Sequence, residues 1–476
     1  MKDGCSPQGQ CGCCTVLVDG AARVACVTST RRVLGREIVT LEGLPDGAAV
    51  RWADALCATG GSQCGFCTPG IIVRLATTAP VAAKVEDALL AHLCRCTGWR
   101  TITDAAALVA QGEVVDPWAD RDPQAAAERA GLEGGAPQRV GTDVALGAAG
   151  FADDTAPAGC LVAVLSADGE WVVGETIDEA RAAAAKVQGR RTTLPLTWPI
   201  DVPPGDWAVT LATTWAEPAY LELDCSWCQP GGEPVTPLAN GGAFGGKVSS
   251  PVAEAARRLA REHGRPVKAV FSREDAVRLG PKRPPVAIGV RADGTGTIRV
   301  VRTPGVADAI ASVAPGLVVE EVAVTGPPTS AALRGAGWVE AAVAVAAASG
   351  ATEIRSAAGA RASAVIDPCD GKVRVQLSCG RVLDAVVLRS YVIGAVHQAL
   401  GLVRSEGIAV DAQGMPHDLT VRSFGIVRAR DMPTVEIDVD DDGSDPVNGS
   451  DAVFAAVALA AWSAAGLPGC WPTDRR

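Results

Sequence analysis

Alternation of apolar and polar residues predicts short strands at the start of the chain, and helical spacing takes over afterwards. The segments TVLVDG, ARVACVT and EIVTLEG, all before residue 47, alternate and carry β-branched residues, which favours strands. From residue 47 to 115 the apolar positions recur at helical spacing, and we expect four short helices there. The first should end at Gly60 and Gly61, and the next should begin at Thr68 and Pro69, a cap residue followed by the residue preferred at the first helical position.

Beyond the helical segment the pattern becomes mixed. Residues 116–138 are rich in Asp, Glu, Ala, Gly and Pro without apolar periodicity, so we predict a linker with one short helix begun at Asp122 and Pro123. Strand and helix patterns then alternate to the end of the chain, and one hairpin is expected to turn at Asp370 and Gly371. The predicted fold class is therefore α+β.

Eight cysteines fall into two groups with the spacing of metal ligands. The downstream group pairs a Cys-x-x-Cys loop, GSQCGFCTPG, with a Cys-x-Cys loop, HLCRCTG, and comprises Cys64, Cys67, Cys94 and Cys96. Its spacing alone suits either an iron–sulfur cluster or a structural zinc ion. The upstream group, in GCSPQGQCGCC and RVACVT, comprises Cys5, Cys11, Cys14 and Cys26. Its spacing is one residue longer than the plant-type ferredoxin pattern, which favours 2Fe-2S clusters.

Composition narrows the class of protein. A chain of 476 residues is long enough for about three domains. Its net charge of −11 provides no sequence-wide basic surface for nucleic acid or an anionic membrane. The N-terminal sequence lacks the apolar segment of a signal peptide, and no apolar run reaches the length of a membrane span. The 16 cysteines therefore indicate metal or redox ligands in a cytoplasmic protein rather than disulfides.

With QCGFCTPG and LCRCTGWR intact, the two cysteine groups in this order resemble the paired 2Fe-2S domains of the xanthine dehydrogenase family of molybdenum hydroxylases. The resemblance implies two 2Fe-2S clusters and a molybdenum-pterin cofactor. It also implies an order of domains. A ferredoxin-like (β-grasp) 2Fe-2S domain, short at its N-terminus, spans 1–46, and a four-helix-bundle 2Fe-2S domain spans 47–115. A linker over 116–138 is followed by an α/β hammerhead-like domain over 139–230 and a shortened molybdenum cofactor-binding domain over 231–476.

Relatives often carry a flavin domain at the position of the linker, and this chain has no room for one. We therefore expect no FAD in the chain. Electrons would leave to an FAD-containing subunit or to a diffusible acceptor.

Four further positions match segments that surround the molybdenum cofactor in the family. The loop NGGAFGGK, from Asn240, would bring backbone amides against the cofactor at Gly242, Phe244, Gly245 and Gly246. Gln63 would contact the pterin, with a loop-stabilising amide as the alternative. Arg334 in ALRGAG would be a cationic contact, with a salt-bridged surface arginine as the alternative. Asp451 would be the base that activates the metal-bound hydroxyl, with a helix N-cap as the alternative.

The sequence leaves two classes of function open. The first is a molybdenum hydroxylase that oxidises an aldehyde or N-heterocycle with water-derived oxygen and passes electrons through both clusters to an external acceptor. Val248 stands where purine-type relatives have Glu, which disfavours a purine substrate. The second is an electron-transfer or partner-binding 2Fe-2S protein with a vestigial, non-catalytic cofactor domain. We expect a small-molecule substrate and no nucleic acid or membrane partner, and the chain could form an oligomer.

Overall fold

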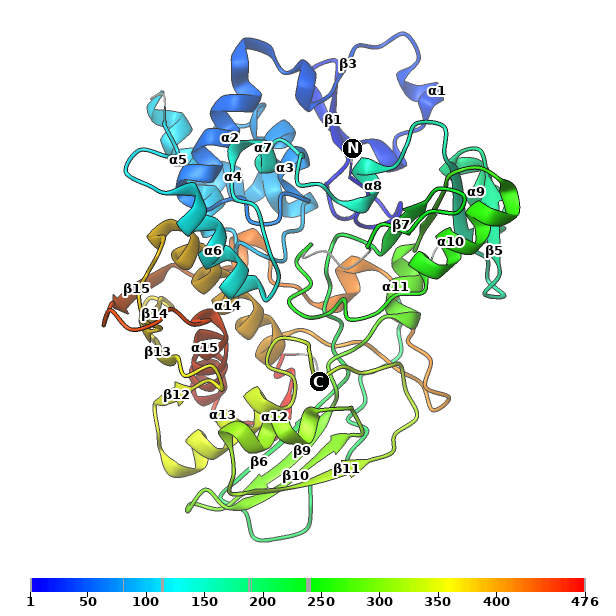
Figure 1. Cartoon of the computed structure of the whole chain (residues 1–476). Helices are drawn as coiled ribbons and strands as arrows, with labels where there is room; N and C mark the ends of the chain where they lie inside the picture. The colour runs from blue at the N-terminus through cyan, green and yellow to red at the C-terminus, as the bar shows by residue number, and fades with distance from the viewer. Residues whose placement is uncertain are drawn as a thin grey trace.

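A small antiparallel sheet follows the first cysteine loop. The computed structural model describes residues 2–79, 81–112, 115–186, 189, 191–236 and 241–474, and Figure 1 shows their arrangement. β1 (Thr15–Val18) lies between β2 (Ala21–Val24) and β3 (Ile38–Val39), antiparallel to both. These are the strands that the alternation predicts. The connecting turns are η1 (Ala25–Val27), α1 (Thr30–Val33), η2 (Leu41–Gly43) and η3 (Pro45–Gly47).

Four helices form the second unit, as predicted, and they are α2 (Ala48–Thr59), α3 (Thr68–Leu75), α4 (Ala82–Ala88) and α5 (Arg100–Gln111). α2 ends at Gly60, whose φ of +73° lies in the region that favours glycine. α3 begins at Thr68 and has Pro69 in its first turn. The turn η4 (Leu89–Ala91) follows α4. The loops before α3 and before α5 carry the second cysteine group.

The predicted linker contains a helix that packs into the body of the molecule. α6 (Pro123–Gly134) begins after Asp122, whose side chain accepts a hydrogen bond from the backbone nitrogen of Gln124 at 2.8 Å. Figure 1 shows α6 lying between the N-terminal helices and α14. Two single-turn helices follow, α7 (Thr142–Ala145) and α8 (Ala152–Thr155).

A four-stranded sheet in the order β5-β4-β8-β7 lies on the right of Figure 1. Its strands are β4 (Leu161–Leu165), β5 (Trp171–Gly174), β7 (Cys225–Cys228) and β8 (Val267–Val270). α9 (Ile177–Ala183) packs on β4 and β5, and α10 (Val252–His263) packs on β7 and β8. The sheet continues across the predicted domain boundary after residue 230, because β7 precedes that boundary and β8 follows it.

A five-stranded sheet in the order β11-β10-β9-β6-β16 forms the lower part of Figure 1. Its strands are β6 (Val209–Thr213), β9 (Val286–Val290), β10 (Gly296–Val301), β11 (Leu317–Val322) and β16 (Cys470–Trp471). α12 (Val306–Val313) and α13 (Trp338–Ser349) pack against this sheet. The helix α11 (Arg273–Leu279) precedes β9.

The last layer combines a sheet with two apolar helices. The sheet order is β12-β13-β14-β15, with strands β12 (Glu353–Arg355), β13 (Arg361–Ile366), β14 (Val373–Ser378) and β15 (Val435–Asp440). β13 and β14 are antiparallel neighbours, which confirms the predicted hairpin. α14 (Ala385–Arg404) and α15 (Ser450–Ala464) pack against each other, and α15 covers β13. The turns η5 (Val421–Phe424) and η6 (Ala429–Asp431) lie between α14 and β15.

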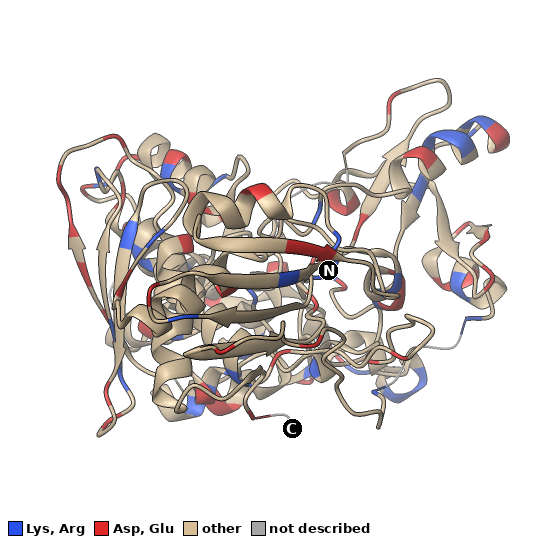
Figure 2. Ribbon diagram, turned by 90° about the horizontal axis from the view of Figure 1, so that it is seen from below, with Lys and Arg blue, Asp and Glu red and all other residues tan. Residues whose placement is uncertain are grey.

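α14 is long and apolar enough, by composition, to cross a membrane. The sequence analysis found no apolar run of this length, because Arg389, Ser390 and His397 interrupt it. In the structure 89% of its apolar window is buried inside the molecule, as in the core helix of a globular protein. Figure 2 shows acidic and basic residues interspersed along the described ribbon.

Candidate functional site

The first cysteine group surrounds one small region at the start of β1. Cys5, Cys11 and Cys14 are buried, and Cys26 in η1 is partly exposed. Backbone nitrogens of Gln8 and Gln10 approach Cys5 Sγ at 3.2 and 3.5 Å. Hydrogen bonds from the thiols of Cys11 and Cys26 hold the pKa of Cys5 well below its usual range. Contacts with neighbouring thiols, including that of Cys5, raise the pKa of Cys11 and of Cys26, so the thiols lie within hydrogen-bond distance of one another, as ligands of one cluster must.

The second cysteine group joins two loops at one end of the helical unit. Cys64 Sγ lies 3.6 Å from Cys96 Sγ. Hydrogen bonds from Cys67 and Cys96 hold the pKa of Cys94 well below its usual range. Cys94 Sγ also lies 3.2 Å from the hydroxyl oxygen of Thr97. All four of these thiols are buried.

The thiols of the second group contact one another in the order Cys67, Cys94, Cys96 and Cys64. A two-iron cluster gives each iron two thiolates, whereas one zinc ion needs all its ligands around a single point. Within the described residues, no group of at least three His, Cys, Asp or Glu side chains is arranged to hold a single metal ion. Four buried thiols that follow one another along two loops, and do not surround a single point, fit a 2Fe-2S cluster.

The two cysteine groups are in direct contact. The backbone nitrogen of Leu93 donates a hydrogen bond to the carbonyl of Cys11 at 3.0 Å. A Cβ on Gly70 would lie 2.3 Å from the carbonyl oxygen of Gly12, so only glycine permits this approach. His92 Nε2 lies 3.1 Å from Thr15 Oγ1, and burial lowers the pKa of His92 to about 4. His92 is therefore neutral at pH 7.

The predicted glycine loop packs against the second cysteine loop. Asn240, its first residue, lies outside the described residues. A Cβ on Gly242 would lie 3.2 Å from Cys96 Sγ, and one on Gly245 would lie 1.7 Å from the carbonyl oxygen of Ala332. Both glycines have φ near +85°, and Phe244 between them has φ +43°. These glycines allow backbone approach to protein atoms, including the ligand loop of the second cluster.

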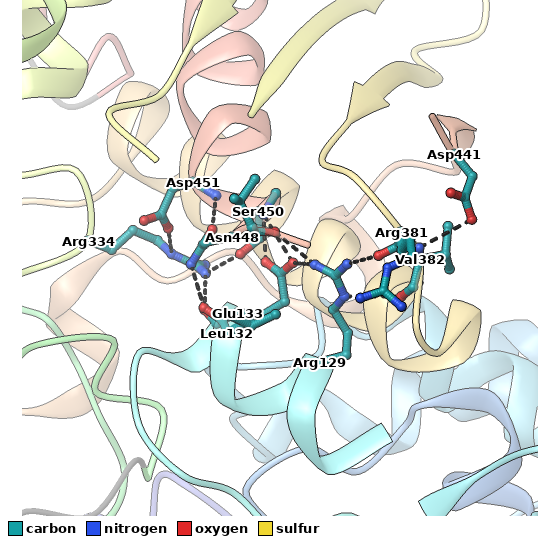
Figure 3. Close-up of polar contacts among 12 residues, drawn as sticks. Arg129, Leu132, Glu133, Arg334, Arg381, Val382, Asp441, Asn448, Ser450 and Asp451 are labelled. Carbon is teal, nitrogen blue, oxygen red and sulfur yellow. Dashed lines mark hydrogen bonds and ion pairs between the residues drawn. The ribbon is translucent and has the colours of Figure 1, made fainter. Parts of the chain in front are cut away.

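Arg334 is buried beside this loop and is fully engaged by protein groups. Its backbone nitrogen donates to the Phe244 carbonyl at 2.9 Å, and its guanidinium lies 4.1 Å from the Phe244 ring centre. Nε is 2.9 Å from Asp451 Oδ1, and Nη2 is 2.6 Å from Ser450 Oγ (Figure 3). Arg334 is thus salt-bridged, but it is not the surface arginine of the alternative interpretation.

The carboxylate of Asp451 faces Arg334 and does not cap α15. The backbone nitrogen of Asp451 donates to Asn448 Oδ1 at 3.0 Å. Glu133 accepts from the backbone nitrogens of Gly449 and Ser450 at 3.1 and 2.8 Å. Asn448 and Glu133 therefore satisfy the N-terminus of α15, and the capping interpretation of Asp451 is wrong.

Two site residues that the sequence analysis missed come from α6 in the predicted linker. Arg129 and Glu133 are almost completely buried and form an ion pair of 3.0 Å. Arg129 also donates to the carbonyls of Val447, Val382 and Arg381 (Figure 3). The i,i+4 spacing of an arginine and a glutamate was visible in the sequence, but this spacing also suits an exposed helix.

Gln63 lies between the second cysteine group and α14. Its Nε2 donates to the Cys96 carbonyl at 3.2 Å and to Ser390 Oγ at 2.9 Å. Its buried Oε1 has no hydrogen-bond partner among the described residues. The Gln63 amide therefore stabilises the cysteine loop, and its Oε1 could accept a hydrogen bond from a ligand.

The space beside these residues decides whether a pterin fits. The cavity lined by Gly242, Phe244, Arg334 and Gln398 has a volume of ≈ 40 Å³, and the one beside Gln63 has ≈ 10 Å³. Small-molecule sites usually enclose about 300–1,000 Å³. Buried polar groups instead satisfy each other, as in the Arg95–Glu406 pair at 2.5 Å. A molybdenum-pterin cofactor does not fit this arrangement of the described residues.

Comparison with known proteins assigns the family. The model of the [2Fe-2S] binding domain matches residues 40–107, and that of the molybdopterin cofactor-binding domain matches residues 235–329. The small subunit of nicotine 6-hydroxylase from Paenarthrobacter nicotinovorans is 41% identical over 119 residues, which are 24% of this chain and 71% of that protein. The chain belongs to the xanthine dehydrogenase family of molybdenum hydroxylases. Both matched domains are therefore present in this member of the family.

Other relatives of this molybdenum hydroxylase family member fall into two size classes. The iron-sulfur-binding subunit of xanthine dehydrogenase from Escherichia coli O157:H7 is 41% identical over 114 residues, 22% of this chain and 70% of that protein. Aldehyde oxidoreductase from Megalodesulfovibrio gigas is 43% identical over 114 residues, 22% of this chain but only 12% of that protein. The sequence match thus spans most of the small subunits and a minor part of the long relatives.

The fold agrees over a longer stretch. The structure of aldehyde oxidoreductase from Desulfovibrio gigas superposes with a TM-score of 0.69 at 16% identity, covering 96% of this chain and 93% of that chain. The enzyme from Desulfovibrio desulfuricans ATCC 27774 gives a TM-score of 0.64 at 14% identity, with the same coverage. At these identities the likeness concerns the fold, and it confirms the α+β prediction.

Proposed function

We propose that this member of the family is an oxidoreductase that oxidises an aldehyde or N-heterocycle and passes the electrons through two 2Fe-2S clusters to an external acceptor in the cytoplasm. The contact between the two cysteine groups, made by Leu93 and Cys11, carries this proposal. It joins both predicted clusters into one path. The contact of Gly242 with the Cys96 loop extends that path to the glycine loop of the cofactor-binding domain.

This proposal requires the space of ≈ 40 Å³ beside Arg334 to widen for a molybdenum cofactor, and Asp451 and Arg334 would then form the catalytic pair. The carboxylate of Asp451 would take up the proton of the water-derived hydroxyl that attacks the substrate. The guanidinium of Arg334, 2.9 Å away, would hold this carboxylate in place. Changing Asp451→Asn should lower turnover by at least about tenfold, because loss of a general base typically costs about 10²–10⁴ in rate. The visible absorbance of the clusters should stay unchanged. Asp445→Asn changes an exposed aspartate on the loop before α15; it is the matched control and should keep the parental turnover.

A second candidate is an electron-transfer protein with a non-catalytic cofactor domain. The cavity of ≈ 40 Å³ beside Arg334 favours it, since a pterin needs far more space. In this case both clusters would exchange electrons with partner proteins, and no substrate would be oxidised by the chain.

Metal and pterin analysis of the purified protein separates the two candidates. Both candidate functions predict about four iron atoms and about four acid-labile sulfides per chain. Molybdenum, pterin and oxidation of an aldehyde or N-heterocycle would support the hydroxylase. Clusters without molybdenum, pterin or oxidation would support the electron-transfer protein. Stoichiometric zinc without visible absorbance would overturn both.

A further inference from the structure

An arginine-rimmed cavity of ≈ 250 Å³ lies beside the two cysteine loops. One wall is the stretch Leu90–Leu93, and the other is built by η5, η6 and the residues between them, with Arg422, Arg428 and Arg430 exposed at the rim. Among the described residues, none of these three guanidinium groups has an ion-pair or hydrogen-bond partner. No Asp or Glu side chain lines the cavity. A chain with a net charge of −11 thus has a locally positive site here.

Hydrogen bonds fasten the arginine wall to the first cysteine loop. The backbone nitrogen of Arg422 donates to Gln10 Oε1 at 3.0 Å, and Gln8 Nε2 donates to the Leu419 carbonyl at 2.9 Å. On the opposite wall, the nitrogen of Leu93 donates to the Cys11 carbonyl at 3.0 Å. A molecule bound in the cavity would therefore touch the residues that lead into the second cysteine loop, and both walls that it touches are hydrogen-bonded to the first cysteine loop.

We propose that this cavity is the docking surface for an acidic redox protein that accepts electrons from the clusters. Carboxylates form strong bidentate pairs with arginine. Interfaces combine arginine with an apolar centre, which the partly exposed Leu90 and Ile426 provide here. The volume is below the about 300–1,000 Å³ of small-molecule sites, which favours side chains of a protein. The acidic remainder of the chain repels such a partner elsewhere and so orients it.

This inference rests on the proposed function only for the source of the electrons, which is the pair of 2Fe-2S clusters. Each reduced cluster gives up one electron and returns to its oxidised state. The partner's redox group gains that electron. No covalent bond is formed or broken in this step, and the molybdenum cofactor takes no part in it.

The test uses the purified full-length protein, reduced with dithionite and freed of excess reductant without oxygen. Oxidised flavodoxin serves as the acidic acceptor, and cytochrome c serves as the basic one. In the Arg428→Glu/Arg430→Glu variant we expect the second-order rate with flavodoxin to fall at least about tenfold at low salt, because electrostatic steering is lost. The rate with cytochrome c should not fall. Arg302→Glu changes an exposed arginine directly after β10, in the sheet that forms the lower part of Figure 1, and should retain the parental rate.

Binding is measured separately by the fluorescence anisotropy of labelled flavodoxin. If the purified protein contained no clusters, the proposed function would be wrong. The anisotropy measurement would still test whether flavodoxin binds at the arginine-rimmed cavity. Equal affinity of the parent and the Arg428→Glu/Arg430→Glu variant for flavodoxin would overturn the inference. Equal weakening by Arg302→Glu would overturn it too, since the effect would then be one of net charge. So would release of bound flavodoxin by stoichiometric flavin mononucleotide, which would assign the cavity to a small anion.

Discussion

Arg334 shows how a buried charge acquires its role from its neighbours. Its guanidinium contacts Asp451, Ser450 and the ring of Phe244. This one side chain therefore connects the glycine loop with the start of α15. A buried arginine with these partners is stable because its donors are satisfied, whereas leaving one partner unpaired would be costly. Arg334 can therefore fill the space beside the glycine loop, or it can hold the carboxylate of Asp451 during catalysis.

The separation of the ligand cysteines into two groups leads to a prediction for single ligands. Cys64→Ser should remove one cluster and leave the other, since the two thiol groups share no member and a serine hydroxyl is a poor substitute for a thiolate. Iron should fall by about half, and one of the two electron paramagnetic resonance signals of the reduced protein should disappear. Cys57→Ser, a buried cysteine of α2 outside both groups, should keep both signals. Loss of both signals from Cys64→Ser would contradict independent sites.

A buried histidine should make stability depend on pH. His397 is fully buried, and burial, followed by the charge of Arg95, lowers its pKa below the ordinary 6.5. Below pH 6.5 the unfolded chain takes up a proton that the folded protein still excludes, so stability is lost as pH falls through this value. His397→Gln, which can still donate to the Val427 carbonyl, should lose less stability between pH 7.5 and 5.5 than the parent. Urea midpoints at the two pH values measure this.

The control for this pH effect is His263→Gln, since His263 is exposed at the end of α10. It should behave like the parent at both pH values. If His397→Gln shows the parental pH dependence, other groups, such as carboxylates, account for the loss.

At the scale of elements, α6 changes the interpretation of the linker. The composition of residues 116–138 predicted a helix correctly, and the structure adds that this helix inserts Arg129 and Glu133 beneath α15. Glu133 gives α15 the negative charge and the hydrogen-bond acceptors that a helix N-terminus favours. α6 therefore fixes the start of the helix that carries Asp451.

Removing this contact should destabilise the protein. Glu133→Ala leaves Arg129 buried without its counter-charge and two amides without an acceptor, and breaking a buried pair typically costs about 3–5 kcal/mol. We expect a lower urea midpoint, followed by circular dichroism. Glu254→Ala, from an exposed ion pair with Arg257 on α10, should change the midpoint little. Equal shifts for both variants would show that burial of Glu133 has no special effect.

The sequence predicts local features well and distant contacts poorly. Cys64 and Cys67 were recognisable because two ligands of one site lie within a single loop, and the strand and helix patterns near them have short periods. Glu133 was not recognisable, because the backbone nitrogens that it binds lie more than 300 residues away along the chain. α14 was missed as a long apolar element because its few polar residues are paired only after folding, as Ser390 is with Gly60.

At the scale of the whole molecule, the layers bring segments that are far apart in the chain to one place. The cluster loops, the glycine loop, α14 and the start of α15 meet around Arg95, Arg334 and Gln398. The predicted electron path therefore runs through the centre of the molecule and reaches the surface near the first cysteine group. The route of the electrons beyond the protein surface depends on which acceptor binds there.

The last prediction concerns this acceptor. Residues 116–138 are the position at which the family resemblance often implies a flavin domain. Here they contain α6, which is held by buried contacts of Arg129 and Glu133. A flavin-binding domain needs at least about 50 residues with a core of its own. We therefore expect no FAD in the purified chain, measured by flavin fluorescence after denaturation. Its reduced clusters should reduce nicotinamide dinucleotide only after a flavin-containing subunit is added, and FAD in stoichiometric amount in the chain itself would contradict this.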